Sequence, residues 1–334
     1  MDDIKLLIND INARKLKPIY FLMGEEPYYI DRISQYIEAN VLTEEEKGFN
    51  QMVLYGRDVT IEEVVSNAKR YPMMADYQVV IVKEAQDLSR NIEKFVDYAK
   101  QPQLSTILVM NYKYKTIDKR KSLYKELKKV GVVYESKKLY ENQIGEWIRR
   151  VLSGQGYTIV PKASQMLVEF LGTDLSKINN ELEKLQIILP KGTQITPQHI
   201  EDNIGISKDY NNFELRKAIG ERNALKAHQI VKYFADNPKD NPMVVTVSLL
   251  FNFFSQLLHF HGLADKSPRS VASSLKINPY FVNEYITAAH NYPMKKVSAV
   301  IATLRDFDVK SKGVGANAMP QGDLLKELIV RILN

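Results

Sequence analysis

The 334-residue chain contains no cysteine, which excludes disulfide bonds and metal sites with cysteine ligands. It also lacks any uninterrupted apolar run that approaches the ~18 residues of a membrane span. Residues 1–5 carry acidic side chains where a signal peptide has basic ones, and no apolar stretch follows them. These absences predict a cytoplasmic protein with no membrane partner.

Charge and short motifs exclude further classes of protein. The chain has 46 basic and 40 acidic residues, and this mild excess of +6 is compatible with a nearby nucleic acid without being diagnostic of it. No histidine and acid spacing typical of zinc sites is present, and neither is a G-x-S-x-G nucleophile motif. We therefore expect no metal, no cofactor and no catalytic residue.

The first 139 residues alternate between strand and helix patterns. The apolar run 18–24 ends in glycine, which is typical of a buried strand in a parallel sheet. Further strands are expected at 49–55, 78–82, 106–110 and 132–135, and helices at 4–11, 28–39, 60–70, 91–100 and 118–130. This alternation predicts a parallel sheet with helices on its faces.

The first strand, glycine and helix have the context of a phosphate-binding loop, whose pattern is G-x-x-x-x-G-K-[ST]. With the first glycine at Gly24, the remaining three positions hold Tyr29, Ile30 and Asp31. The chain thus lacks the lysine that contacts the phosphates and the hydroxyl that binds Mg²⁺.

Acidic residues and a misplaced cation also argue against a nucleotide here. Glu25 and Glu26 lie where the free amides of a helix N-terminus would meet an anion, and they would repel a triphosphate. The strand at 79–82 ends in Lys83, where an ATPase of this class carries an aspartate for Mg²⁺. The sequence predicts a nucleotide site that has lost its nucleotide.

From about residue 140 onward only helical patterns are expected, and no strand. Segment 140–208 predicts a small helical domain with helices at 141–153, 161–171 and 175–189 and a short one from 197. Segment 209–334 predicts a second domain of longer helices, of which 243–263 is the most apolar. We therefore expect three domains, at 1–139, 140–208 and 209–334.

Pro72, Met73 and Met74 lie between the helical segment that ends near residue 70 and the apolar strand 79–82. Two neighbouring side chains in a loop or at a helix end cannot both enter one core, so at least one methionine is expected to face outward. Methionine is flexible and polarizable, which suits a surface that fits a groove on a partner. The alternative is that both methionines fold back and cap the sheet.

Two basic segments could contact nucleic-acid phosphates. The first contains Lys113, Lys115, Lys119 and Arg120, and for it we favour a solvated helix face. The second is a flexible basic loop before the last helix, which could approach a nucleic-acid backbone or a neighbouring subunit. It contains Lys310, Lys312, Gly313 and Gly315.

At this point the motifs, taken in order, suggest a family. The chain resembles the delta subunit of the bacterial DNA polymerase III clamp loader over essentially its full length. The resemblance rests on the order and spacing of these segments: 20–28 (YFLMGEEPY), 72–74 (PMM) with 78–82 (QVVIV), 147–148 (WI), 180–185 (NELEKL) with 195–196 (IT), and 324–328 (LLKEL).

The resemblance implies an AAA+/RecA-like α/β domain with a degenerate P-loop, then a helical lid and a helical collar. It implies a subunit of a DNA-directed DNA polymerase holoenzyme, with no intrinsic catalytic activity. The partners would be the ATPase subunits (tau/gamma) and delta-prime of a hetero-pentamer, the sliding clamp (beta) and, through the complex, primed DNA.

The family resemblance also implies a binding element. The segment before the third strand would enter a hydrophobic pocket on the ring-shaped clamp and spring one clamp interface open. In this chain that segment holds Pro72, Met73, Met74 and Tyr77. Some family members carry Leu-Phe where this chain has Met73-Met74.

Two other classes of function stay open. An ATP-hydrolysing AAA+ protein with an atypical site is opposed by Tyr29, Ile30 and Asp31, and a nucleotide-binding assay would separate it. A free-standing nucleic-acid-binding protein is favoured by the basic run at 113–129, and salt-dependent DNA affinity of the isolated chain would support it.

Overall fold

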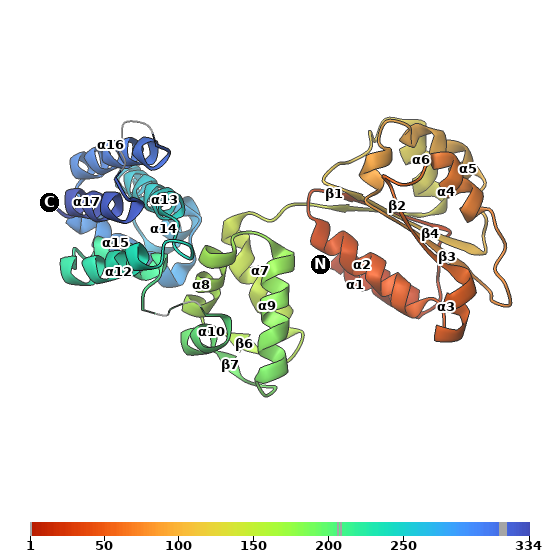
Figure 1. Cartoon of the computed structure of the whole chain (residues 1–334), viewed down its shortest axis with the longest axis horizontal. Coiled ribbons are helices and arrows are strands. Elements are labelled where there is room, and N and C mark those ends of the chain that lie inside the picture. The colour runs from red at the N-terminus through yellow and green to blue at the C-terminus, as the bar shows by residue number, and fades with distance from the viewer. Residues whose placement is uncertain (1, 206, 208, 314–318) are drawn as a thin grey trace. The chain divides into compact units, whose positions relative to one another are not determined.

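The computed structural model describes residues 2–205, 207, 209–313 and 319–334, and it divides into two compact units, Met1–Leu139 and Tyr140–Asn334. The first unit contains a five-stranded parallel sheet with the strand order β2-β3-β4-β1-β5 (Figure 1). Its strands are β1 (Ile19–Gly24), β2 (Gln51–Tyr55), β3 (Gln78–Lys83), β4 (Thr106–Lys113) and β5 (Val132–Ser136). The expected fold class, a parallel α/β sheet followed by helical domains, is confirmed.

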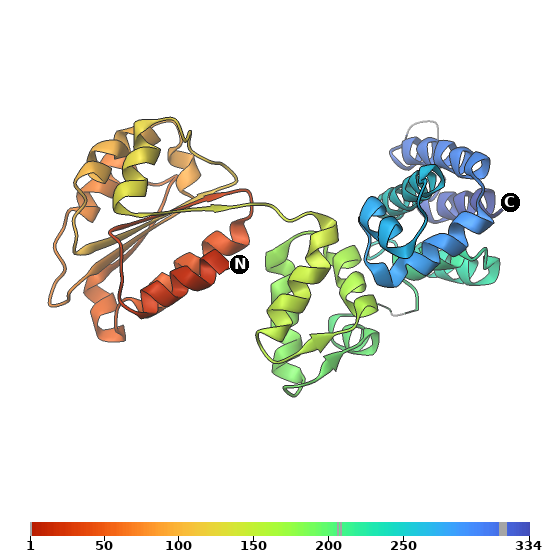
Figure 2. The same cartoon turned by 180° about the vertical axis from the view of Figure 1, so that it is seen from behind.

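Helices cover both faces of this sheet (Figures 1 and 2). Because side chains alternate along a strand, Tyr20 and Leu22 pack with α1 (Asp2–Asn12) and α2 (Pro27–Asn40). Phe21 and Met23 face the other way, toward α4 (Ile61–Ala68), α5 (Val96–Lys100) and α6 (Ser122–Val130). Two 3-10 turns, η1 (Ala85–Leu88) and η2 (Ile92–Phe95), connect β3 to α5.

One helix of the first unit was not expected. Helix α3 (Glu44–Asn50) occupies the start of the segment predicted as a strand at 49–55. A reciprocal capping box between Thr43 and Glu46 begins this helix. Three acidic residues in its first turn stabilise it by their interaction with the positive end of the helix dipole. The predicted start of α6 was also wrong, because residues 118–121 form a turn and the helix begins at Ser122.

The second unit is mainly helical. Its first part contains four helices, α7 (Glu141–Ser153), α8 (Pro161–Leu171), α9 (Leu175–Ile188) and α10 (Pro197–Ile204). The expectation of no strand after residue 139 was wrong, because β6 (Thr158–Ile159) and β7 (Gln194–Ile195) pair in parallel. Two residues are too few to leave a period-two pattern in a sequence.

The rest of the second unit has a single large apolar core, formed by helices α11 to α17. These are α11 (Asn212–Gly220), α12 (Ala224–Asp236), α13 (Met243–Gly262), α14 (Pro268–Leu275), α15 (Val282–Asn291), α16 (Met294–Ser311) and α17 (Gln321–Leu333), with the 3-10 turn η3 (Pro279–Phe281). The division of this unit into a lid and a collar near residue 208 stays a prediction.

Among the described residues, α13 is the one helix long and apolar enough to cross a membrane by length and composition. Its buried side chains, which include Leu250, Phe254 and Leu257, belong to the core shared with the neighbouring helices. We therefore interpret α13 as the central core helix of its domain.

Candidate functional site

The loop between α4 and β3 exposes apolar side chains, and we call its residues 71–77 the tip. The Met74 side chain is 99% exposed and that of Met73 is 58% exposed, and Tyr71 is exposed as well. The prediction that at least one methionine faces outward is confirmed, and the alternative in which both cap the sheet is wrong. Met74 has φ +54°, a left-handed conformation that costs a non-glycine residue roughly 1–2 kcal/mol. Such strain gathers at functional sites.

Hydrogen bonds fix the ends of the tip. At its C-terminal end, Gln78 Nε2 donates to the Arg70 carbonyl oxygen at 2.6 Å and to Thr106 Oγ1 at 2.7 Å. Thr106 Oγ1 in turn donates to the Ala68 carbonyl oxygen at 2.8 Å, which ties the end of α4 to β4. Tyr77, expected at the partner surface, is half-buried and packs against the core of the sheet. The tip is therefore a short exposed loop on a rigid base.

At the predicted degenerate nucleotide site, backbone groups of the chain bond to one another. Gly24 has φ +126°, and a Cβ at this position would lie 2.0 Å from the Ser136 carbonyl oxygen, so only glycine fits. The Gly24 amide donates to the Lys115 carbonyl oxygen at 3.0 Å, and the Glu25 amide donates to the Ser136 carbonyl oxygen at 3.1 Å. These two N–H groups, which a phosphate-binding loop would offer to an anion, are already used.

Glu26 acts at the start of α2 as the sequence predicted. Its carboxylate is buried and accepts a hydrogen bond from the Tyr28 amide at 3.1 Å, which caps the helix. A negative charge thus occupies the position at which a nucleotide phosphate would meet the helix dipole. Tyr29 and Ile30 lie on α2.

Lys113 occupies the crevice between β1 and β4, where the helices that follow these strands cover opposite faces and ligands bind in this fold class. Its Nζ atom lies 2.9 Å from Asp31 Oδ1 and 2.7 Å from Glu84 Oε1. Burial lowers the pKa of Lys113, but the hydrogen bonds to both carboxylates outweigh this and the net pKa is raised.

Glu84 shows the matching shift. Burial raises its pKa, but hydrogen bonds from Lys113 and Gln86 prevail and lower it. An internal ammonium therefore pairs with both acids at this edge of the sheet and offsets one of their two negative charges. The sequence analysis does not predict this triad, because the pairing of Gly24 with Lys113 on β1 and β4 is set by the register of the sheet.

The expected DNA-contact residues are mostly paired with other groups. Lys113 is half-buried and ion-paired with Asp31 and Glu84, and its contact with DNA stays a prediction. Lys119 pairs with Glu135 at 2.6 Å and Arg120 with Asp118 at 2.9 Å. The other three basic residues also have partners. Lys115 donates a hydrogen bond to Ser89 Oγ, Lys310 lies over the Phe307 ring, and Lys312 forms an ion pair with Asp308.

The predicted basic loop of Lys310, Lys312, Gly313 and Gly315 differs from the structure at its start, and Gly315 lies outside the described residues. Lys310 lies in the last turn of α16 and Lys312 follows it directly. The first basic segment is a solvated helix face only in its second part, because Lys125, Lys128 and Lys129 are exposed on α6. Lys119 and Arg120 precede the helix and form ion pairs there.

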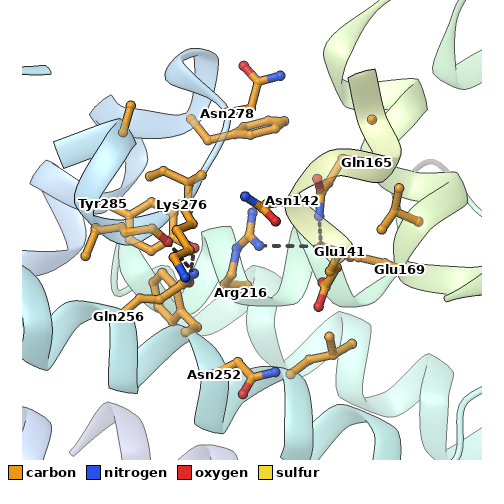
Figure 3. Close-up of a pocket in the computed structure, with 18 of the residues that line it drawn as sticks. Glu141, Asn142, Gln165, Glu169, Arg216, Asn252, Gln256, Lys276, Asn278 and Tyr285 are labelled. Atoms are coloured by element: carbon orange, nitrogen blue, oxygen red, sulfur yellow. Dashed lines mark hydrogen bonds and ion pairs between the residues drawn. The ribbon is translucent and has the colours of Figure 1, made fainter. Parts of the chain in front are cut away.

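The second unit contains a cavity of about 1060 Å³, shown in Figure 3. At its centre the Arg216 guanidinium lies 3.4 Å from Glu169 of α8 and 3.7 Å from Glu284 of α15, and it stacks over the Phe213 ring at 4.8 Å. Burial raises the pKa of Glu169 despite this partner. Since carboxylates already neutralise the central cation, the arrangement holds α8, α11 and α15 together and leaves no free positive charge on Arg216 for a phosphate.

These features define a class of protein: a parallel α/β domain with an exposed apolar tip, in which the amides of Gly24 and Glu25 are bonded within the chain, followed by a helical unit. Among the described residues, no group of three or more histidine and acidic side chains is placed to hold a metal ion.

Comparison with known proteins identifies the family. The sequence profile described as DNA polymerase III, delta subunit matches residues 20–137, and that described as DNA polymerase III delta subunit, C-terminal domain matches residues 209–325. Together these matches cover more than half of the chain, which belongs to the family of DNA polymerase III delta subunits. It is thus an accessory subunit of a replicative polymerase.

Two relatives from Bacillus subtilis agree with this assignment. DNA polymerase III subunit delta of strain 168 is 26% identical over 310 residues, which is 89% of this chain and 88% of the relative. The solved structure of the DNA clamp loader delta protein has a TM-score of 0.57 and 22% identity, and the match covers 99% of each chain. The likeness to this solved structure supports the assignment of the fold.

Proposed function

We propose that this chain is the clamp-loader delta subunit that binds the sliding clamp (beta) and opens it for loading onto primed DNA. The observation that carries the proposal is the tip, on which Met73 and Met74 are both exposed while the loop around them is anchored. Apolar side chains that fill a partner's pocket supply much of the free energy of an interface. Thioether side chains adapt to the shape of such a pocket.

The mechanism is differential binding. A tip that fits the open clamp better than the closed one shifts the clamp toward its open state, by no more than the difference between the two affinities. No bond is made or broken in this chain, and we assign it no catalytic activity. ATP acts in related subunits by exposing or hiding the tip.

This role implies a set of partners. They are the clamp, the ATPase subunits (tau/gamma) and delta-prime in a hetero-pentamer, and primed DNA through the complex. The site of action is the cytoplasm. The helical unit, whose large core is separate from that of the α/β unit, is the part that we assign to assembly with the other subunits.

The proposal is tested with the variant Met73→Ala/Met74→Ala. We expect its affinity for the cognate clamp to fall by about tenfold or more, since the variant loses both apolar anchors. Calorimetric titration of clamp with full-length chain measures the change. The thermal unfolding midpoint should be unchanged, because neither side chain contributes to the core.

A matched control is Ile187→Ala/Ile188→Ala, another adjacent and exposed apolar pair, on α9 of the second unit. This variant should bind the clamp like the wild type. Equal affinity of the methionine variant and the wild type would contradict the proposal.

A further inference from the structure

Asn50, at the end of α3, pairs with both main-chain groups of Met73. Its Nδ2 atom donates to the Met73 carbonyl oxygen at 2.9 Å, and the Met73 amide donates to Asn50 Oδ1 at 2.6 Å. The two residues are 23 positions apart in the sequence. Asn50 is 5% exposed, so a buried side chain holds the backbone of an exposed loop. The amide group contacts Met73 as a neighbouring β-strand would.

The structure holds Asn50 itself firmly. The capping box of Thr43 and Glu46 begins α3, and Asn50 Nδ2 also lies 3.2 Å from the Glu46 carbonyl oxygen one turn earlier. The next residue, Gln51, starts β2 and pairs with β3, the strand that follows the tip. The amide is therefore fixed from both sides, by a helix end and by the sheet.

We propose that Asn50 is a positioning residue for clamp binding. It fixes the backbone at Met73, so that the exposed side chains of Met73 and Met74 are presented in one arrangement before the partner arrives. A loop ordered in advance loses less conformational entropy on binding, and this raises affinity without a new contact. Asn50 acts through the methionines, and the inference rests on the proposed function.

The first test is a double-mutant cycle on the full-length chain, measured by calorimetric titration with the cognate clamp. Asn50→Ala removes both hydrogen bonds to Met73, and we expect about fivefold weaker binding. In the Met73→Ala/Met74→Ala background the same change should weaken binding by less than about twofold, because both side chains that it positions are gone. Equal losses in the two backgrounds, or no loss in the native one, would overturn the inference.

Asn203→Ala is the matched control for this cycle. Asn203 bonds a carbonyl oxygen one helical turn earlier, that of His199 at 2.8 Å, as Asn50 does with Glu46. The control loses this local bond and should keep wild-type affinity.

The second test uses Asn50→Asp, which keeps the shape of the side chain. At pH 8 its carboxylate repels the Met73 carbonyl oxygen, whereas the protonated acid donates to that oxygen as the amide does. Burial raises the pKa of such a carboxyl group, so protonation falls within reach of mildly acidic buffers. We expect its affinity, relative to the wild type at the same pH, to recover between pH 8 and pH 5.

If the affinity of Asn50→Asp relative to the wild type is the same at pH 8 and at pH 5, the inference is overturned. A different result would reject the proposed function itself: normal clamp binding by Met73→Ala/Met74→Ala. Loss of binding in that variant together with normal binding by Asn50→Ala would reject the positioning role alone.

Discussion

Lys113 extends from the end of β4 into the crevice where this fold class binds its ligand, and there it joins the carboxylates of Asp31 and Glu84. In a nucleotide-binding relative of this fold, a metal ion and a lysine would supply positive charge to the phosphates at this edge of the sheet. Here the positive charge belongs to the chain and is already balanced. At the scale of single residues, the site is filled by the protein itself.

The first prediction at this scale concerns nucleotide binding. We expect the full-length chain to show no saturable binding of ATP with Mg²⁺ in a calorimetric titration to about 1 mM. The amides of Gly24 and Glu25 are bonded within the chain, and Glu26 occupies the positive end of the α2 dipole.

The variant Lys113→Ala serves as the control for that titration. It frees Asp31 and Glu84 but leaves the two backbone amides occupied, so it should not bind ATP either. Micromolar affinity in either protein would show that the closed site can open, and would contradict our interpretation.

At the scale of elements, Arg216 joins three helices of the second unit. It is carried by α11, and its two acidic partners belong to α8 and α15. Burial raises the pKa of Glu169 and of Glu284 even though the nearby arginine opposes the shift. Removing the arginine would therefore leave the enclosed carboxylate of Glu169 and the half-buried carboxylate of Glu284 without this cation.

We expect Arg216→Met to reduce the free energy of unfolding by about 3–5 kcal/mol at pH 8. The loss should shrink at pH 5. An acid whose folded pKa is raised destabilises the protein only above its unfolded pKa, and this cost disappears as pH falls and the buried group is protonated. Chemical denaturation of wild type and variant at both pH values measures the difference.

Arg222→Met is the matched control for this pH dependence. Arg222 bonds the Leu333 carbonyl oxygen and stacks on Tyr292, so its removal strands no carboxylate. Its effect on unfolding should be the same at both pH values. An Arg216→Met loss that does not change with pH would contradict the assignment of Glu169 and Glu284 as the acids responsible.

At the scale of the whole molecule, the chain consists of two compact units with separate cores. The first unit buries apolar side chains on both faces of its sheet, using only its own helices. The tip and all the hydrogen bonds that anchor it also belong to this unit.

We therefore expect a fragment of residues 1–139 to unfold cooperatively and to bind the clamp within about threefold of the affinity of the full-length chain. Circular dichroism during thermal unfolding and calorimetric titration are the measurements. The same fragment with Met73→Ala/Met74→Ala is the control for binding through the tip. A fragment that folds but fails to bind would show that the second unit contributes to the clamp contact.

Much of the fold could be read from the sequence, because parallel strands buried on both faces leave continuous apolar runs such as 79–82. Helix α3 was missed although its signal, a threonine three residues before Glu46, is a readable capping box. The two-residue strands β6 and β7 left no readable pattern. At the candidate site, the exposure of the methionine pair could be argued from their adjacency, whereas the packing of Tyr77 against the core could not.

The sequence by itself determined the alternation of strands and helices, the absence of a phosphate-binding lysine, and an apolar pair that could not be wholly buried. These features follow from the order of neighbouring residues along the chain. Only the tertiary structure decided that Asn50 holds Met73 and that Lys113 pairs with both Asp31 and Glu84. Such contacts join residues distant in sequence, and their partners are selected by the register of the sheet and the ends of its strands.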